Sequence, residues 1–160
     1  MEIKRLSKPY YNRFKEMFCK YFQDDLLEEL SNEFIIKNII DSQVLVLFEK
    51  NIIFIDLIYS SKVPVGFIIY QIDSDNSDWK ERCGWGFIRE LYVDKDYRKL
   101  HLGSELLKHA ENTLSKLSAK HIYLTCDDNN ISRNFYLKNG YVPENKFNLH
   151  NTHEYFSKNI

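Results

Sequence analysis

Residues 90–104 have the sequence Glu90-Leu-Tyr-Val-Asp-Lys-Asp-Tyr-Arg-Lys-Leu-His-Leu-Gly103-Ser104, and this stretch decides the fold. It is typical of a strand that runs through a charged loop into a helix. The first turn of a helix leaves backbone N–H groups unpaired and carries the positive end of the helix dipole, so such a junction suits a pyrophosphate. Gly103 lets the backbone approach an anion closely, while Arg98, Lys99 and the Ser104 hydroxyl add donors. The alternative is a solvated loop with an ordinary N-cap.

The residues after this junction predict a parallel crossover. One face of the expected helix is apolar, and a β-branched and aromatic strand follows it at residues 121–125. A strand, a helix and a second strand within this length form a right-handed βαβ unit. The apolar helix positions are Leu102, Leu106, Leu107, Ala110, Leu114 and Leu117.

Other elements are expected on both sides of this unit. Apolar residues at spacings of three and four predict a helix at about residues 9–22 and a second one from residue 26 to 40, capped by Asp24 or Asp25. Residues 44–48, 52–58 and 63–72 have the composition of an antiparallel meander, and a strand is expected at 85–93. A helix at 131–138 should end at Asn139-Gly140, with strands near Tyr141 and at 153–156.

Composition limits the possible classes of protein. A length of 160 residues suits one domain, and a net charge of -1 without a basic run disfavours nucleic acid as a partner. No apolar stretch approaches the roughly 20 residues of a membrane helix, and no apolar segment of a signal peptide follows the charged start. We therefore expect a cytoplasmic protein without a membrane partner.

The three cysteines, Cys19, Cys83 and Cys126, are widely spaced and include no CxxC pair. They signal neither a disulfide framework nor a zinc site, so no metal is expected. Cys126 follows a predicted strand and invites comparison with an acyl-cysteine nucleophile. No histidine and acid stand in an evident supporting pattern, so we interpret it as a core residue.

Two ordered motifs resemble the GNAT N-acetyltransferase superfamily. Residues 98–103 resemble its pyrophosphate loop, R/Q-x-x-G-x-G/A, and residues 91–93 resemble its fourth strand. Residues 129–141 are similar to its pattern N-x-x-A-x-x-F-Y-x-K-x-G-F. The resemblance implies an α/β fold: one GNAT-like domain over residues 1–160, with a twisted, mostly antiparallel mixed sheet and a central parallel βαβ crossover flanked by helices. One departure is His101, which stands at the family's first glycine, and we expect it to tune the binding of CoA.

The resemblance also implies acetyl-CoA as the acyl donor and direct attack of an amine on the thioester. Tyr136 matches the family's usual general acid, which protonates the departing thiolate, and the alternative is an aromatic residue packed in the core. Glu90 is a candidate general base, acting directly or through water, and the alternative is a structural carboxylate paired with Arg89 or a loop cation. The implied CoA-binding residues are Leu91, Tyr92, Val93, Arg98, Lys99, Leu100, His101, Leu102, Gly103, Ser104, Asn129, Ser132 and Tyr136.

The sequence leaves the acceptor open, as a small-molecule or a peptide amine. The loop at residues 73–81 carries Asp73, Asp75, Asp78 and Glu81, which hint at a cationic acceptor if they are not simply solvated. A homodimer is a further expectation. The alternative function is a non-catalytic CoA-binding sensor or interaction module. A generic nucleotide site ranks last, because neither a Walker A motif nor Gly-x-Gly-x-x-Gly is present.

Overall fold

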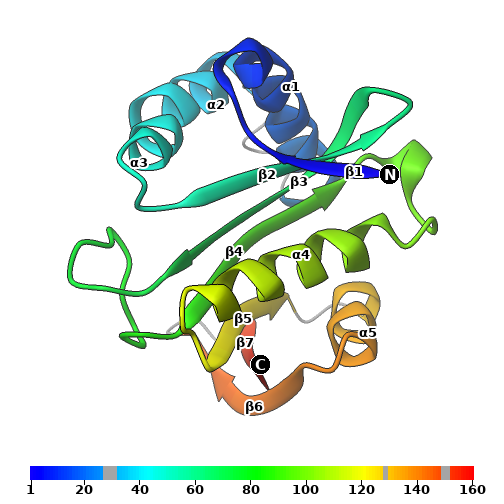
Figure 1. The fold of residues 1–160 in the computed structure, drawn as a ribbon. Coiled ribbons are helices and arrows are strands. Elements are labelled where there is room, and N and C mark those ends of the chain that lie inside the picture. Colours follow the sequence, from blue (N-terminus) through cyan, green and yellow to red (C-terminus); the bar gives the residue numbers. More distant parts are fainter. Residues whose placement is uncertain (27–31, 128–129, 149–151) are drawn as a thin grey trace. The chain divides into compact units, whose positions relative to one another are not determined.

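The computed structural model describes residues 1–26, 32–127, 130–148 and 152–160, and Figure 1 shows how its elements follow one another. The strands are β1 (Glu2–Arg5), β2 (Phe54–Ser60), β3 (Val63–Ile72), β4 (Gly86–Val93), β5 (His121–Asp127), β6 (Val142–Phe147) and β7 (His153–Asn159). The helices are α1 (Tyr11–Tyr21), α2 (Glu33–Ile39), α3 (Leu45–Glu49), α4 (Leu102–Lys116) and α5 (Asn130–Lys138). Short 3-10 and π segments are η1 (Lys8–Tyr10), η2 (Phe22–Leu26), η4 (Ile40–Val44) and η5 (Lys95–Tyr97).

The described strands form one mixed sheet in the hydrogen-bonded order β1-β2-β3-β4-β5-β7-β6. β4 and β5 are parallel, with Gly86 opposite Ile122, and α4 connects them, so the predicted βαβ crossover is confirmed. β1 pairs antiparallel with β2, and β7 pairs antiparallel with both β5 and β6. The predicted α/β fold with a mixed sheet is therefore confirmed.

The chain divides into two units, and the first contains Met1–Ile69 and Glu90–His109. Its core is aromatic and aliphatic and is contributed by α1, α2, α3 and the strands β2 and β3. Phe14, Phe18 and Phe67 form a cluster of rings at its centre, with centroids 5.2 to 5.6 Å apart. Ser61 and Lys62 join β2 to β3 with φ values of 49° and 70°, as a two-residue type I′ turn requires.

Two sequence predictions fail in this unit, and one strand was missed. Residues 44–48 are helical and not a strand, because the helical backbone continues from α2 through η4 into α3 and buries Leu45. A short apolar run of this length fits a strand or a buried helix equally well. α2 begins at Glu33, where the Asn32 side chain caps it, and Asp24 and Asp25 belong to η2 instead. β1 was not predicted, since its alternating apolar and charged residues are too few to form a pattern.

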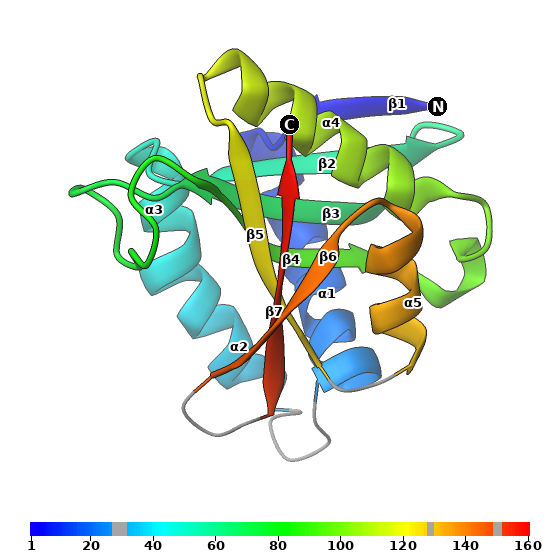
Figure 2. The same cartoon turned by 90° about the horizontal axis from the view of Figure 1, so that it is seen from below.

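The second unit contains Tyr70–Arg89 and Ala110–Ile160. Figure 2 shows β7 beside β5 and β6, and β5 and β7 pair along their whole length from His121↔Asn159 to Asp127↔His153. α5 ends as predicted at Asn139-Gly140, where Gly140 has a φ of 85°. Cys126 is buried, as expected for a core residue.

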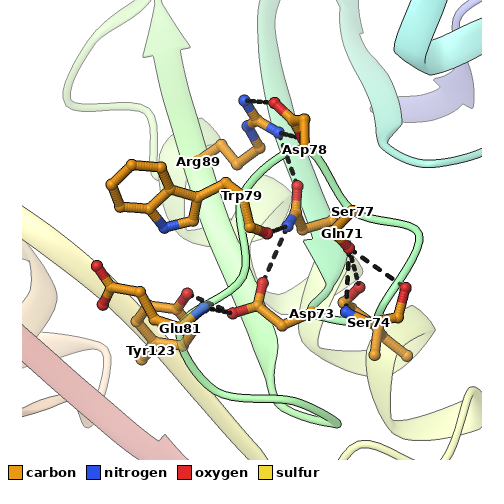
Figure 3. Close-up of polar contacts among 10 residues, drawn as sticks. Gln71, Asp73, Ser74, Ser77, Asp78, Trp79, Glu81, Arg89 and Tyr123 are labelled. Carbon is orange, nitrogen blue, oxygen red and sulfur yellow. Dashed lines mark hydrogen bonds and ion pairs between the residues drawn. The ribbon is translucent and has the colours of Figure 1, made fainter.

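The loop between β3 and β4 is exposed over most of residues 75–81, as predicted, but its first carboxylate is an exception. Asp73 is fully buried and accepts hydrogen bonds from the Gln71 amide (2.9 Å), the Tyr123 hydroxyl (2.6 Å) and two backbone N–H groups, those of Glu81 and Arg82 (3.0 Å each). Figure 3 shows this carboxylate at the centre of the network. Asp73 therefore organises the loop from within and is not offered to a cationic acceptor.

The other predicted carboxylates of this loop also have partners. Asp78 pairs with the Arg89 guanidinium at 2.7 Å, which holds the pKa of Asp78 below its usual value, although burial opposes this effect. Asp75 pairs with Lys80, and the Glu81 carboxylate accepts the Tyr155 hydroxyl at 2.8 Å. The paired charges weaken the case for an ammonium site here. No helix among the described residues is long and apolar enough to cross a lipid bilayer.

Candidate functional site

The end of β4 is held in place by a close approach to β3. A Cβ atom added to Gly66 would lie 2.6 Å from the carbonyl oxygen of Tyr92, so β3 has no room for a side chain there. One residue further, the Asp94 N–H donates to the Val65 carbonyl at 2.9 Å. The backbone of the predicted segment Leu91, Tyr92 and Val93 is thus fixed before the loop begins.

We expect Gly66→Ala to lower the free energy of unfolding by about 1–3 kcal/mol, because overpacking against a backbone carbonyl forces the two strands apart. Urea unfolding of the two proteins measures this difference. A midpoint equal to that of the unaltered protein would show that β3 can move away from Tyr92 at no cost.

The loop after β4 turns twice through left-handed backbone. Lys99 has a φ of 66° and His101 a φ of 60°, both in the region that favours glycine. α4 then begins at Leu102, and its first i→i−4 hydrogen bond runs from the Glu105 N–H to the His101 carbonyl at 3.1 Å. The amides of residues 102–104 therefore belong to the first helical turn, which has no preceding helical carbonyl to accept them.

His101 adopts the left-handed backbone that a glycine at this position favours, so the departure from the motif leaves the turn intact. Its side chain is exposed, as are those of Lys99 and Leu100, whereas Leu102 is buried and anchors the start of α4. Cations beside a helix start fit a diphosphate. The residues predicted for this purpose, 98–104, thus form one continuous junction.

Arg98 makes structural contacts that the sequence did not predict. Its Nε donates to the Val93 carbonyl at 2.9 Å, and its Nη2 lies 2.8 Å from the Asp25 carboxylate. Its guanidinium also lies 5.7 Å from the centre of the Tyr92 ring. Arg98 therefore ties the loop to the end of β4, and part of its charge is compensated. The partner Asp25 is 73 residues away, and no local pattern predicts such a contact.

The loop has two further ion pairs, one with the last turn of α1 and one with η2, which follows it. Lys20 lies 2.9 Å from Asp94, and Lys95 lies 2.9 Å from Asp24. Asp24 also accepts the buried Tyr92 hydroxyl at 3.1 Å, and burial together with Asp24 raises the pKa of Tyr92. These contacts fix the loop from residue 94 to residue 98.

Glu90 accepts a hydrogen bond from the hydroxyl of Tyr21, a largely buried residue at the end of α1. The Tyr21 ring packs against Phe67 and Tyr92, with centroids 5.9 and 5.8 Å away. Arg89, which the sequence suggested as a partner for Glu90, contacts Gln71 and Asp78 instead. Sequence reasoning missed Tyr21, and its only signal was a position on the apolar face of α1.

Tyr136 lies in α5, half-buried, with its ring against those of Phe135, Tyr141 and Phe156 at 5.1, 5.9 and 6.4 Å. Ser132 precedes it by one helical turn, so the two side chains share a face of α5. Asn129, the third predicted residue of this motif, lies outside the described residues. Within the part of the chain that the structure describes, no cluster of three His, Cys, Asp or Glu residues is suited to a metal ion.

The model of the acetyltransferase (GNAT) family matches residues 10–141, so the chain belongs to this family. Solved structures of low sequence identity share its fold. The PaiA N-acetyltransferase of Thermoplasma acidophilum, solved in complex with coenzyme A, is 21% identical with a TM-score of 0.79, and the match covers 99% of this chain and 98% of that one. A GNAT-family acetyltransferase of Staphylococcus aureus is 24% identical with a TM-score of 0.70, over 99% and 98%.

A Bacillus anthracis protein solved with acetyl coenzyme A is 22% identical with a TM-score of 0.57, over 68% of this chain and 62% of that one. Comparison with curated proteins gives no match. The family model therefore places the chain in the GNAT acetyltransferase family, and these structures share its fold.

Proposed function

We propose that this protein transfers an acetyl group from acetyl-CoA to a primary amine. The observation that carries the proposal is the junction between β4 and α4, where left-handed turns at Lys99 and His101 lead into the first turn of the helix. Such a turn offers backbone N–H donors and a positive dipole to a diphosphate. Two structures of the same fold were solved with coenzyme A or acetyl coenzyme A, which supports the same donor here.

The roles of the binding residues follow the order of the chain. The backbone of Leu91, Tyr92 and Val93 pairs with the pantetheine arm, and residues 98–104 hold the pyrophosphate. Arg98 and Lys99 supply positive charge to it, the His101 imidazole lies beside it, and Arg98 also supports the loop. Ser132, Asn129 and Tyr136 contact the thiol end of the arm. The bound donor supplies an acyl thioester, and the protein supplies orientation and proton transfer.

Two residues carry the proton transfers in this proposal. Glu90 accepts a proton from the acceptor ammonium, directly or through water, because only a neutral amine is a nucleophile. The Tyr21 hydroxyl orients its carboxylate. Tyr136 donates its phenolic proton to the departing thiolate. The proposal extends to one catalytic domain over residues 1–160, to a cytoplasmic homodimer, and to a small-molecule or peptide amine as acceptor.

Calorimetric titration with acetyl-CoA and CoA tests the donor site. We expect binding with a dissociation constant on the order of 10 μM. Lys99→Glu should weaken it about tenfold, since it places a negative charge beside the pyrophosphate. The matched control is Lys62→Glu, which changes another exposed lysine with positive φ, in the turn between β2 and β3. The control should stay within twofold of the unaltered protein.

A screen of primary amines then tests catalysis, with turnover measured as the release of the free thiol of CoA. Turnover with any amine supports the transferase. Binding of acetyl-CoA without turnover across the screen would favour the alternative, a non-catalytic CoA-binding module. Absence of binding would overturn the proposal itself.

A further inference from the structure

Three residues of β7 point toward α5. Alternation along a strand places Glu154, Phe156 and Lys158 on one face, and each contacts a different turn of the helix. Glu154 pairs with Arg133, Phe156 packs against Tyr136, and the Lys158 ammonium donates to the Asn139 carbonyl at 2.9 Å. Arg133 and Tyr136 are three positions apart and lie on one face of α5, and Asn139 directly follows the last residue of the helix. Tyr136 is the middle contact of this series.

The contact nearest the start of α5 is a shielded ion pair. The Glu154 carboxylate is buried, at 6% exposure, and accepts a hydrogen bond from the Arg133 guanidinium. The same guanidinium lies 5.3 Å from the centre of the Phe156 ring. Because its carboxylate is removed from water, Glu154 depends on Arg133 for compensation of its charge. The pair therefore holds the first turns of α5 against β7.

The contact at the end of α5 combines a helix cap with a lysine. The Gly140 N–H donates to the Leu137 carbonyl and the Tyr141 N–H donates to the Tyr136 carbonyl, both at 3.1 Å, which is a Schellman motif. Lys158 then donates to the remaining Asn139 carbonyl and to both oxygens of the Glu111 carboxylate, at 3.0 and 2.9 Å. A cation at this place also matches the negative end of the helix dipole.

The C-terminal cap of α5 contacts Tyr136 through its backbone and through its ring. Tyr136 is the helix residue whose carbonyl accepts the Tyr141 N–H, and the rings of Tyr136 and Tyr141 pack edge to face at 5.9 Å. Phe156 packs on the Tyr136 ring at 6.4 Å. Neither ring supplies a hydrogen bond that would fix α5 along its axis. The ion pair of Glu154 with Arg133 and the hydrogen bond from Lys158 to the Asn139 carbonyl, on either side of Tyr136, supply this constraint.

We propose that Glu154 and Lys158 are positioning residues, which hold α5 on β7 and so fix the direction of the Tyr136 phenol. The inference rests on the proposed function, because it assigns the two residues to the placement of the general acid. It adds a part of the chain, β7, that the family motifs in residues 90–141 do not include.

Two charge-removing variants and two controls test the inference. Glu154→Gln keeps the length of the side chain and removes its charge. Lys158→Gln removes the charge with a shorter side chain, whereas Lys158→Arg keeps the charge. Tyr155→Phe is the matched control, since it removes a hydroxyl on the opposite face of β7, where Tyr155 contacts Glu81. We expect the two glutamine variants to lower kcat about tenfold, while KM for acetyl-CoA stays within twofold. Lys158→Arg and Tyr155→Phe should keep at least half of the original kcat.

A second readout needs neither donor nor acceptor. In protein labelled with ¹³C at tyrosine Cζ, the Tyr136 resonance is assigned by its loss in Tyr136→Phe. Glu154→Gln and Lys158→Gln should shift or broaden this resonance, and Tyr155→Phe should leave it unchanged. If Lys158→Gln does not fold, Glu154→Gln decides the question alone.

The outcomes separate the two proposals. An unchanged Tyr136 resonance in a folded Glu154→Gln protein overturns the inference, even if kcat falls. An unchanged kcat in a protein that acetylates amines overturns it as well. If the unaltered protein acetylates no amine, the proposed function fails, and the resonance alone then shows whether β7 orients Tyr136.

Discussion

Replacing Tyr136 with phenylalanine is expected to lower kcat about 100-fold, while the dissociation constant for acetyl-CoA changes less than twofold. The variant keeps the ring that packs against Tyr141 and Phe156 and loses only the hydroxyl. Without this proton donor, the thiolate must leave unprotonated or take a proton from water. Steady-state kinetics with an amine from the screen and calorimetry with acetyl-CoA measure the two quantities.

The control for this experiment is Tyr155→Phe, which removes a tyrosine hydroxyl from the same unit without touching α5. It should retain kcat. If Tyr136→Phe also keeps kcat within twofold, the leaving group needs no acid from this residue, and Tyr136 is a packing residue of α5. A loss of acetyl-CoA affinity with unchanged kcat would instead assign its hydroxyl to binding.

The elements with strong periodicity were predicted from sequence, because the spacing of their apolar residues fits only one type of secondary structure. α4 has an apolar face that repeats over four turns, and its start and the following strand were found within a few residues. The end of α5 was found because Asn139-Gly140 is a strong left-handed signal. Residues 44–48 failed because five apolar residues carry no period that separates a strand from a helix.

The local structure of the candidate site was predicted from sequence, whereas the contacts of its residues were not. The motif placed residues 98–104 on a loop that enters a helix, as the structure has it. The partners of that loop come from distant sequence: Asp25 for Arg98, and Tyr21 for Glu90. Such pairs depend on the packing of α1 against the strands, which one sequence without its fold does not specify. Hence the sequence did not predict that the Arg98 guanidinium also supports the backbone of the loop.

The sequence also did not predict the contacts of Asp73, which was assigned to an acceptor but is held in a network of hydrogen bonds. Its replacement has the largest effect on stability that we expect. Asp73→Ala should lower the free energy of unfolding by about 3 kcal/mol, because it leaves the Tyr123 hydroxyl, the Gln71 amide and two backbone N–H groups without their acceptor. For a chain of this size the melting temperature should fall by about 10 °C. Thermal and urea unfolding followed by circular dichroism measure both values.

Asp75→Ala is the matched control, because Asp75 is exposed in the same loop and pairs only with Lys80 at the surface. It should unfold like the unaltered protein. The comparison of the two variants also decides whether Asp73 is a structural residue of the loop or binds the acceptor. If Asp73→Ala keeps its stability and instead raises KM for a cationic amine, Asp73 serves the acceptor, as the sequence alone suggested. A large loss of stability assigns Asp73 to the loop, and the cationic acceptor then has to be recognised elsewhere.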